Sequence, residues 1–139
     1  MILEALGDYL QNTSGAFGPH ASQGTLGTSI FLGKMPATPD YCITLYEYEG
    51  MQPRESFGGN PYDVDMPRIQ VVVRGARDDY PTARDGAKAI RDLLSDLTDV
   101  TISSTKILRV ASLGATIPLG LDDKDRPRIS ANFQAYVER

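Results

Sequence analysis

The residues that could carry out nucleophilic or acid–base chemistry are few in this chain and lie far apart. His20 is the only histidine and Cys42 the only cysteine. A serine-hydrolase triad needs a histidine that is held by an acid and touches a nucleophile. His20 instead follows Gly18 and Pro19 in a loop-forming segment, and no Gly-x-Ser-x-Gly turn is present. We therefore interpret His20 as an exposed loop residue and Cys42 as a small apolar residue of a strand.

The possible metal ligands do not form a complete site either. Zinc needs three or four Cys or His ligands, or carboxylates in their place, and this chain has one of each. The acidic segment Asp122-Asp123-Lys124-Asp125 is similar to a calcium loop, but it lacks the Asp-x-Asp-x-Asp-Gly spacing and the terminal Glu. We interpret it as a solvated turn, and we expect no bound metal and no cofactor.

Two weaker patterns also have plainer explanations. Residues 24–29 are rich in glycine, but Lys34 is followed by Met35, where a phosphate-binding loop has Ser or Thr before a helix. Glu47 and Glu49 would lie on one face of a strand, where a polar surface is a simpler interpretation than a pair of acid–base groups. The chain is predicted not to be an enzyme.

Length, charge and composition restrict the class of protein. The chain has 139 residues, of which 41% are hydrophobic and 23% charged, as is ordinary for one globular domain spanning residues 1–139. A net charge of −4 argues against general nucleic-acid binding. No apolar run approaches the ~20 residues of a membrane span, and residues 1–6 do not have the pattern of a signal peptide. A lone cysteine fits a reducing compartment or a particle that is indifferent to redox conditions.

Two helices are predicted from apolar residues that recur at intervals of three and four. A short N-terminal helix is expected over residues 1–12, and Gly15 can end it in a left-handed conformation. The main helix is expected from Tyr80 to Leu97, with its apolar face made by Tyr80, Ala83, Ala87, Ile90, Leu94 and Leu97.

Strands are predicted where apolar and polar residues alternate. The segments concerned are 30–32, 41–48, 67–74, 106–111, 114–120 and 128–137, and the last alternates strictly. A turn at 122–127 is expected to join the last two in a hairpin. The predicted core comprises Ile43, Leu45, Ile69, Val71, Val73, Ala87, Ile90, Leu94, Ile129, Phe133 and Val137. The fold class is therefore α+β: a mostly antiparallel sheet of about four to six strands, with the main helix packed on one face and a short N-terminal helix.

Two long segments are predicted to be loops. Residues 13–28 are rich in Gly, Ser and Thr, which favours a flexible loop. Residues 49–66 contain several glycines and prolines, and loops of this length within compact domains are usually functional or disordered. Because this segment also carries Met51, Phe57, Tyr62, Val64 and Met66, we expect some of these apolar groups to meet a partner surface.

Basic residues flank the central strand and continue into the main helix. They are Arg68, Arg74, Arg77, Arg84, Lys88 and Arg91, and they alternate with Asp78, Asp79, Asp85 and Asp92. Two interpretations stay open: a mixed-charge face in contact with solvent, or a charged surface that a neighbouring subunit contacts.

The order of these segments resembles the bacteriophage tail terminator family, whose members are also labelled minor capsid or tail completion proteins of long-tailed phages. The similarity covers the chain from about Ile30 to Val137 and is carried by structural rather than catalytic motifs. The matching segments are residues 40–50 with Pro53, residues 66–74, Tyr80 with Ala83, the helix around 90–94, and residues 122–133.

The resemblance implies a subunit of a homo-hexameric ring that caps the tail tube and joins it to a head-side neck or stopper protein. DNA would pass through the ring without specific binding, and the protein would be a virion component that assembles in the cytoplasm of the bacterial host. The interface with other subunits or with the neck is expected at Met51, Phe57, Tyr62, Met66, Arg68 and Arg74. Two alternatives remain: another neck or head-completion subunit, such as a stopper or connector, or a small ligand-binding or enzymatic domain.

Overall fold

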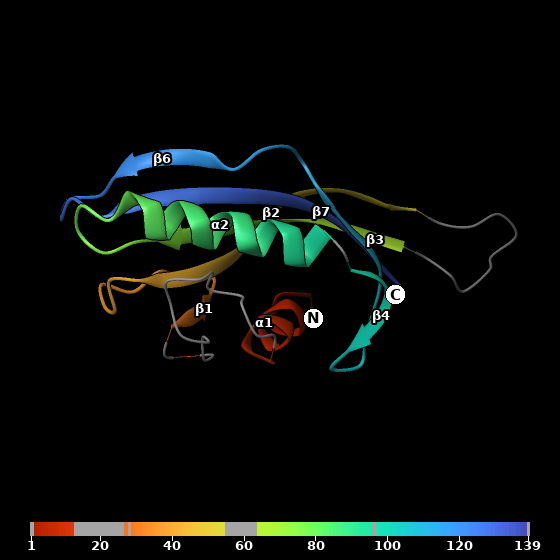
Figure 1. Cartoon of the computed structure of the whole chain (residues 1–139). Coiled ribbons are helices and arrows are strands. Elements are labelled where there is room, and N and C mark those ends of the chain that lie inside the picture. Colours follow the sequence, from red (N-terminus) through yellow and green to blue (C-terminus); the bar gives the residue numbers. More distant parts are fainter. Residues whose placement is uncertain (1, 13–26, 28, 55–63, 96, 139) are drawn as a thin grey trace, which may run out of the picture.

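The computed structural model describes residues 2–12, 27, 29–54, 64–95 and 97–138, with the side chains of residues 49–54 excepted. The elements within these residues follow one another in the order shown in Figure 1. They are α1 (Ile2–Asn12), β1 (Ile30–Leu32), β2 (Cys42–Arg54), β3 (Val64–Arg74), α2 (Tyr80–Ser95), β4 (Thr98–Ile102), β5 (Thr105–Ser112), β6 (Ile117–Leu121) and β7 (Pro127–Glu138). The α+β class is confirmed.

The strands form a single sheet in the order β1-β2-β3-β7-β5-β4, and β6 pairs with β7 off this path. Only the β1–β2 pair is parallel among the described strands. On the side away from β3, β7 pairs with β6 over residues 127–130 and with β5 over residues 133–137. The predicted hairpin between the last two strands is confirmed.

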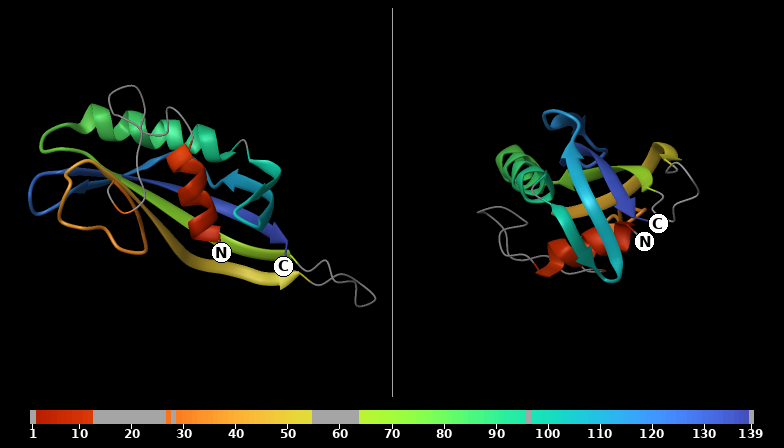
Figure 2. Two further views of the ribbon diagram at one scale, coloured as in Figure 1. Left: turned by 90° about the horizontal axis from the view of Figure 1, so that it is seen from below. Right: turned by 90° about the vertical axis from the view of Figure 1, so that its right-hand side faces the viewer.

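Both helices bury the same face of the sheet, which curls around them (Figure 2). Helix α2 packs against β3, β5 and β7, while α1 packs against β1, β2 and β4. The first turn of α2 is fixed by Asp79, whose Oδ1 accepts a hydrogen bond of 3.4 Å from the backbone N–H of Thr82. The helix ends at Ser95, two residues before the predicted Leu97, although Leu97 still reaches the core.

Every residue of the predicted core is buried. The register of β7 is also as predicted, because Ile129, Phe133 and Val137 face the helices. The second face of β7 was expected in water, and this is wrong for Ser130 and Gln134, which are 1% and 5% exposed. Strands flank β7 on both sides, and the Gln134 amide donates to the backbone carbonyls of Met66 (2.9 Å) and Pro67 (3.1 Å).

The predicted loop over residues 49–66 is wrong at both ends. Strand β2 continues to Arg54 and β3 begins at Val64, with Met51 opposite Met66. The register between these strands shifts on either side of Met51, and β1 pairs only with residues 43–45 of β2. Glycine and proline are tolerated at such bulges and unpaired edges, so Gly50 and Pro53 did not end the strand. Residues 55–63 and 13–28, apart from Gly27, lie outside the described residues, so the loops expected there stay predictions.

Strand β4 has no counterpart in the sequence analysis. All five of its residues are exposed or half-buried, and only two of them, Val100 and Ile102, are apolar, so the alternation is too short to stand out in the sequence. It joins β5 through Ser103 and Ser104, whose φ angles of 49° and 67° place both residues in the left-handed region. Neither residue is glycine or asparagine, and the usual signal of a two-residue hairpin is therefore missing from the sequence.

Gly86 lies within α2, where glycine costs about 1 kcal/mol relative to alanine. A Cβ atom added at this position would collide with the Tyr41 hydroxyl and would lie 3.3 Å from Cγ1 of Val73. Glycine therefore allows the helix to approach both the Tyr41 ring and β3.

We expect Gly86→Ala to lower the free energy of unfolding by about 1 kcal/mol, because overpacking outweighs the gain in helix propensity. Tyr41→Phe removes the hydroxyl that would collide, so the double variant should be more stable than the sum of the two single changes predicts. Urea unfolding of the three variants checks this. A Gly86→Ala protein more stable than the wild type would contradict it.

Candidate functional site

The turn between β6 and β7 is organised by Asp122. Its Oδ1 accepts hydrogen bonds of 2.9 Å from the backbone N–H groups of Lys124 and Arg126. Asp125, with a φ of 58°, donates its backbone N–H to the carbonyl of Asp122 at 3.1 Å. The acidic run is therefore a locally hydrogen-bonded turn, as predicted. Among the described residues, no group of three His, Cys, Asp or Glu side chains could hold a metal ion.

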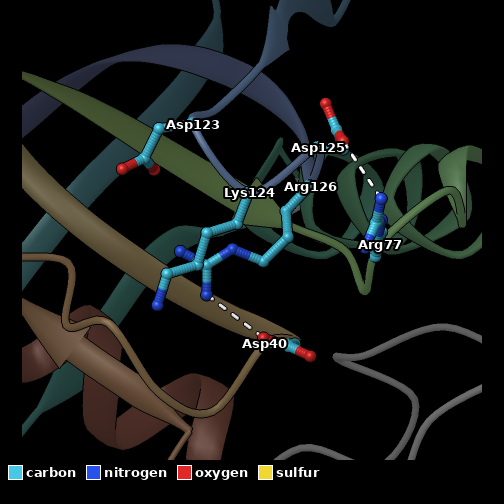
Figure 3. A pocket seen from close by; sticks show the side chains of 6 residues that line it. All are labelled: Asp40, Arg77, Asp123, Lys124, Asp125 and Arg126. Carbon is cyan, nitrogen blue, oxygen red and sulfur yellow. Dashed lines mark hydrogen bonds and ion pairs between the residues drawn. The ribbon is translucent and has the colours of Figure 1, made fainter.

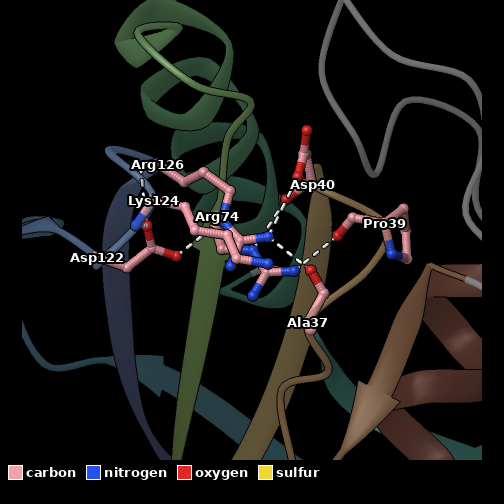
Figure 4. A network of polar contacts seen from close by, with 7 residues as sticks. All are labelled: Ala37, Pro39, Asp40, Arg74, Asp122, Lys124 and Arg126. Carbon is pink, nitrogen blue, oxygen red and sulfur yellow. Dashed lines mark hydrogen bonds and ion pairs between the residues drawn. The ribbon is translucent and has the colours of Figure 1, made fainter.

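Arg126 leaves this turn and is buried, with 5% of its side chain exposed. Its Nε donates to Oδ2 of Asp122 at 2.8 Å, and its Nη1 donates to Oδ1 of Asp40 at 3.1 Å and to the carbonyl of Ala37 at 2.6 Å (Figure 4). One guanidinium thus ties the β6–β7 turn to the segment before β2. Sequence reasoning missed this residue, since an arginine in an acidic turn gives no local sign of burial.

Arg74, at the end of β3, binds the same segment. It is 3% exposed, and it donates its Nε to the carbonyl of Asp40 at 3.0 Å and its Nη2 to the carbonyl of Pro39 at 2.6 Å. These acceptors are neutral, and Arg74 makes no ion pair with a carboxylate among the described residues.

The charge of Asp122 follows from its partners. Burial by itself raises the pKa of this carboxyl, but the backbone N–H groups of Arg126 and Lys124 and the Arg126 guanidinium together lower it below its usual value. Burial lowers the pKa of Arg126, and the two carboxylates of Asp122 and Asp40 more than offset that effect. Both members of the pair are therefore held in their charged forms.

Two hollows flank Arg126. The first, of about 440 Å³, lies over the turn and is lined by Asp40, Arg77 and Asp125 among others (Figure 3). In it, Arg77 and Asp125 pair at 3.5 Å with more than half of each side chain exposed. Such exposed pairs contribute little to stability.

The second hollow, of about 510 Å³, lies on the sheet face that the helices leave uncovered. We call it the arginine groove and define it by Arg74, Arg126, Arg128, Tyr46, Gln70 and Leu119, which are among its lining residues. Asp122 and Asp123 also line it. The groove thus brings together three arginines from β3, the turn and β7, of which only Arg74 was a sequence-based candidate.

The other residues predicted at an interface have different environments. Met66 is buried, with 4% of its surface exposed, and its role at an interface stays a prediction. Arg68 is half-buried and donates its Nε to Oε1 of Gln134 at 3.1 Å. The backbone of Met51 lies in β2, but its side chain is outside the described residues, as are Phe57 and Tyr62. Their role at an interface stays a prediction.

The predicted basic stripe does not form one continuous surface, because Arg74 is buried. Two arginines of α2, Arg84 and Arg91, pair with the carboxylate of the next residue, Asp85 or Asp92, at 3.3 and 3.7 Å. This arrangement favours the interpretation as a mixed-charge face in contact with solvent.

Within the described residues, no helix is long and apolar enough to cross a membrane.

Comparison with solved structures finds the same fold in another protein. A chain of a structure titled "Virion of native gene transfer agent (GTA) particle" aligns with a TM-score of 0.72 and 17% sequence identity, over 99% of this chain and 95% of that chain. At this identity the likeness shows the shared fold alone. A comparison with curated proteins gave no match.

The family is shown by the sequence itself. The family model described as "Bacteriophage tail terminator protein" matches residues 20–139. The chain is therefore a phage structural protein, and it belongs to the bacteriophage tail terminator family, as the resemblance in the sequence implied. Membership of this family supports a location in the virion.

Proposed function

We propose that this chain is the subunit of a closed homo-hexameric ring that caps the tail tube and joins it to the head-side neck or stopper protein. The observation that carries the proposal is the family match over residues 20–139. A ring follows from geometry, because a head-to-tail contact repeated by rotation either closes or grows into a filament. A protein that ends a tube must close.

The charge of the chain is compatible with this role. DNA would pass through the ring, and a subunit with a net charge of −4 would not retain phosphates by general electrostatic attraction. The partners are then other copies of the chain, the tail tube protein and the neck protein, and assembly takes place in the cytoplasm of the bacterial host. We propose that the connection between β2 and β3, residues 55–63 with Phe57 and Tyr62, contacts a neighbouring subunit or the neck.

Tail length and head attachment test the function. Producing cells that lack the chain should make tails of uncontrolled length that do not join heads, and the wild-type gene should restore both properties. Tails of normal length that fail to join heads would instead support the second candidate, a stopper or connector subunit. Normal tails on heads would contradict both. Negative-stain images of the purified protein or of tail tips should show the ring.

The same assay tests the proposed interface. Phe57→Ser combined with Tyr62→Ser should reproduce the defect in tail length or head attachment. The control is Tyr80→Ser, which also removes an aromatic side chain, here one that is 43% exposed at the start of α2. Normal particles from the double variant would mean that residues 55–63 are not an interface.

A further inference from the structure

Two arginines of the groove form no ion pair with a carboxylate among the described residues. Arg74 is buried and donates only to carbonyls. Arg128 is half-buried, and its Nε is fully covered yet has no hydrogen-bond partner among the described residues. Asp122 is already engaged by Arg126, and the exposed Asp123 forms no ion pair with either arginine. Buried donors are normally paired, so Arg128 lacks an acceptor although Asp122 and Asp123 line the same groove.

An apolar strip borders the same groove. Among the exposed large hydrophobic side chains of the described residues, four lie within residues 113–121; we call them the β6 patch, and they are Leu113 (48% exposed), Ile117 (50%), Leu119 (40%) and Leu121 (56%). Leu119 lines the groove beside Arg128. Strand β6 pairs only with β7 among the described strands, so no described strand pairs with its second edge. Clustered apolar exposure of this kind marks an interaction surface.

A third observation links the groove to the patch. Ser130, two residues after Arg128 on β7, lies opposite Ile117 of β6. Its Oγ is buried and has no hydrogen-bond partner among the described residues. Unpaired polar atoms therefore occur at two of the four β7 residues that pair with β6, where a partner that covered the strand could also supply an acceptor.

We infer that the arginine groove and the β6 patch form one docking surface, and that its occupant is a carboxylate-bearing segment of a second copy of this chain. The carboxylate would pair with Arg128 and approach Arg74, while apolar atoms of the same segment would cover Leu119. This arrangement combines an anchoring charge pair with an apolar contact, as is typical of specific protein interfaces.

Charge complementarity favours a second copy as the occupant. The chain has 18 acidic and 14 basic residues and a net charge of −4. Outside the groove, acidic residues therefore outnumber basic ones, and a second copy has carboxylates that would serve as the missing acceptor for Arg128. The inference rests on the proposed ring, in which each subunit must present two different surfaces that fit each other. The groove would be the basic surface of that contact.

Site-specific photo-crosslinking in producing cells tests the inference. A benzophenone amino acid placed at Leu119 should give an adduct of two copies of this chain after irradiation. Arg128→Glu in the same protein should lower the yield of that adduct by at least about tenfold, because two carboxylates would then face each other. Arg128→Gln, which removes the charge without reversing it, should lower the yield less. If Arg128→Glu does not fold, the glutamine variant alone decides.

The matched control is Arg91→Glu, which reverses a charge on α2 and should leave the adduct yield unchanged. An adduct with a different virion protein, or no adduct at all, would overturn the inference, as would an adduct that survives Arg128→Glu. A different observation would contradict the proposed function, namely that purified particles do not contain this chain. Because crosslinking is scored in cells, the two failures can be told apart.

Discussion

Replacing Phe133 with alanine should lower the free energy of unfolding by about 3–5 kcal/mol. Phe133 is fully buried in the central part of β7, where it lies opposite Ile69 of β3 and Ser112 of β5. Strands on both sides and helices above it prevent the structure from collapsing into the space that the ring leaves. The cost therefore includes both the lost apolar burial and a residual cavity. Urea unfolding at equilibrium measures it.

The control for this substitution is Tyr80→Ala, which also removes an aromatic ring but one that is 43% exposed. Its cost should stay within about 0.5 kcal/mol. A loss below about 1 kcal/mol for Phe133→Ala would contradict the prediction, since it would place the ring on the surface and shift the register of β7 by one residue.

Replacing Arg126 with methionine should lower the free energy of unfolding by about 3 kcal/mol, because it leaves Asp122 without its cationic partner in a largely buried site. The side chain of Asp122 is 12% exposed and that of Asp40 is 58% exposed. After the substitution, only the Asp122 carboxylate is therefore left as an unpaired charge in a largely buried site. The variant also leaves the carbonyl of Ala37 without the 2.6 Å hydrogen bond from Nη1. Thermal and urea unfolding measure the loss.

The matched control is Arg77→Met, the same change at an arginine that is 72% exposed and pairs with Asp125. We expect an effect within about 0.5 kcal/mol for it.

Acid provides a second readout. The pKa of Asp122 is lowered in the folded protein. The ionised carboxylate therefore stabilises the fold fully at pH values above its pKa in the unfolded chain, about 3.9, and this stabilisation is lost as the pH falls through the folded pKa. The difference in the free energy of unfolding between wild type and Arg126→Met should therefore become smaller in that acidic range. An equal difference at pH 7 and at strongly acidic pH would show that Arg126 acts by packing alone.

The fold class and the core were predictable because burial on a strand or helix repeats at a period that can be counted in a single sequence. The strict alternation over residues 128–137 placed Ile129, Phe133 and Val137 on the core face, and the three-and-four spacing after Tyr80 identified the apolar face of α2. The family resemblance rested on the same segments, and the match over residues 20–139 bears it out.

The strand ends were not predictable in this way. Gly50 and Pro53 normally end a strand, but β2 continues through them because its register with β3 shifts there and β1 does not reach that edge. Whether a residue lies at a bulge or at an unpaired edge depends on its neighbours in the sheet. That information is absent from the local sequence.

The arginine groove depends still more on tertiary structure. Arg126 pairs with Asp40 across 86 positions of sequence, and Arg74 reaches the carbonyl of Asp40 across 34. Locally, Arg126 follows three aspartates and a lysine and has the sequence context of a solvated turn. The period of the apolar residues was thus enough to predict which of them are buried, because that period is a property of a single helix or strand. The fold decided which arginines become buried, paired or left without an anion, because burial and charge compensation depend on groups that distant segments bring together.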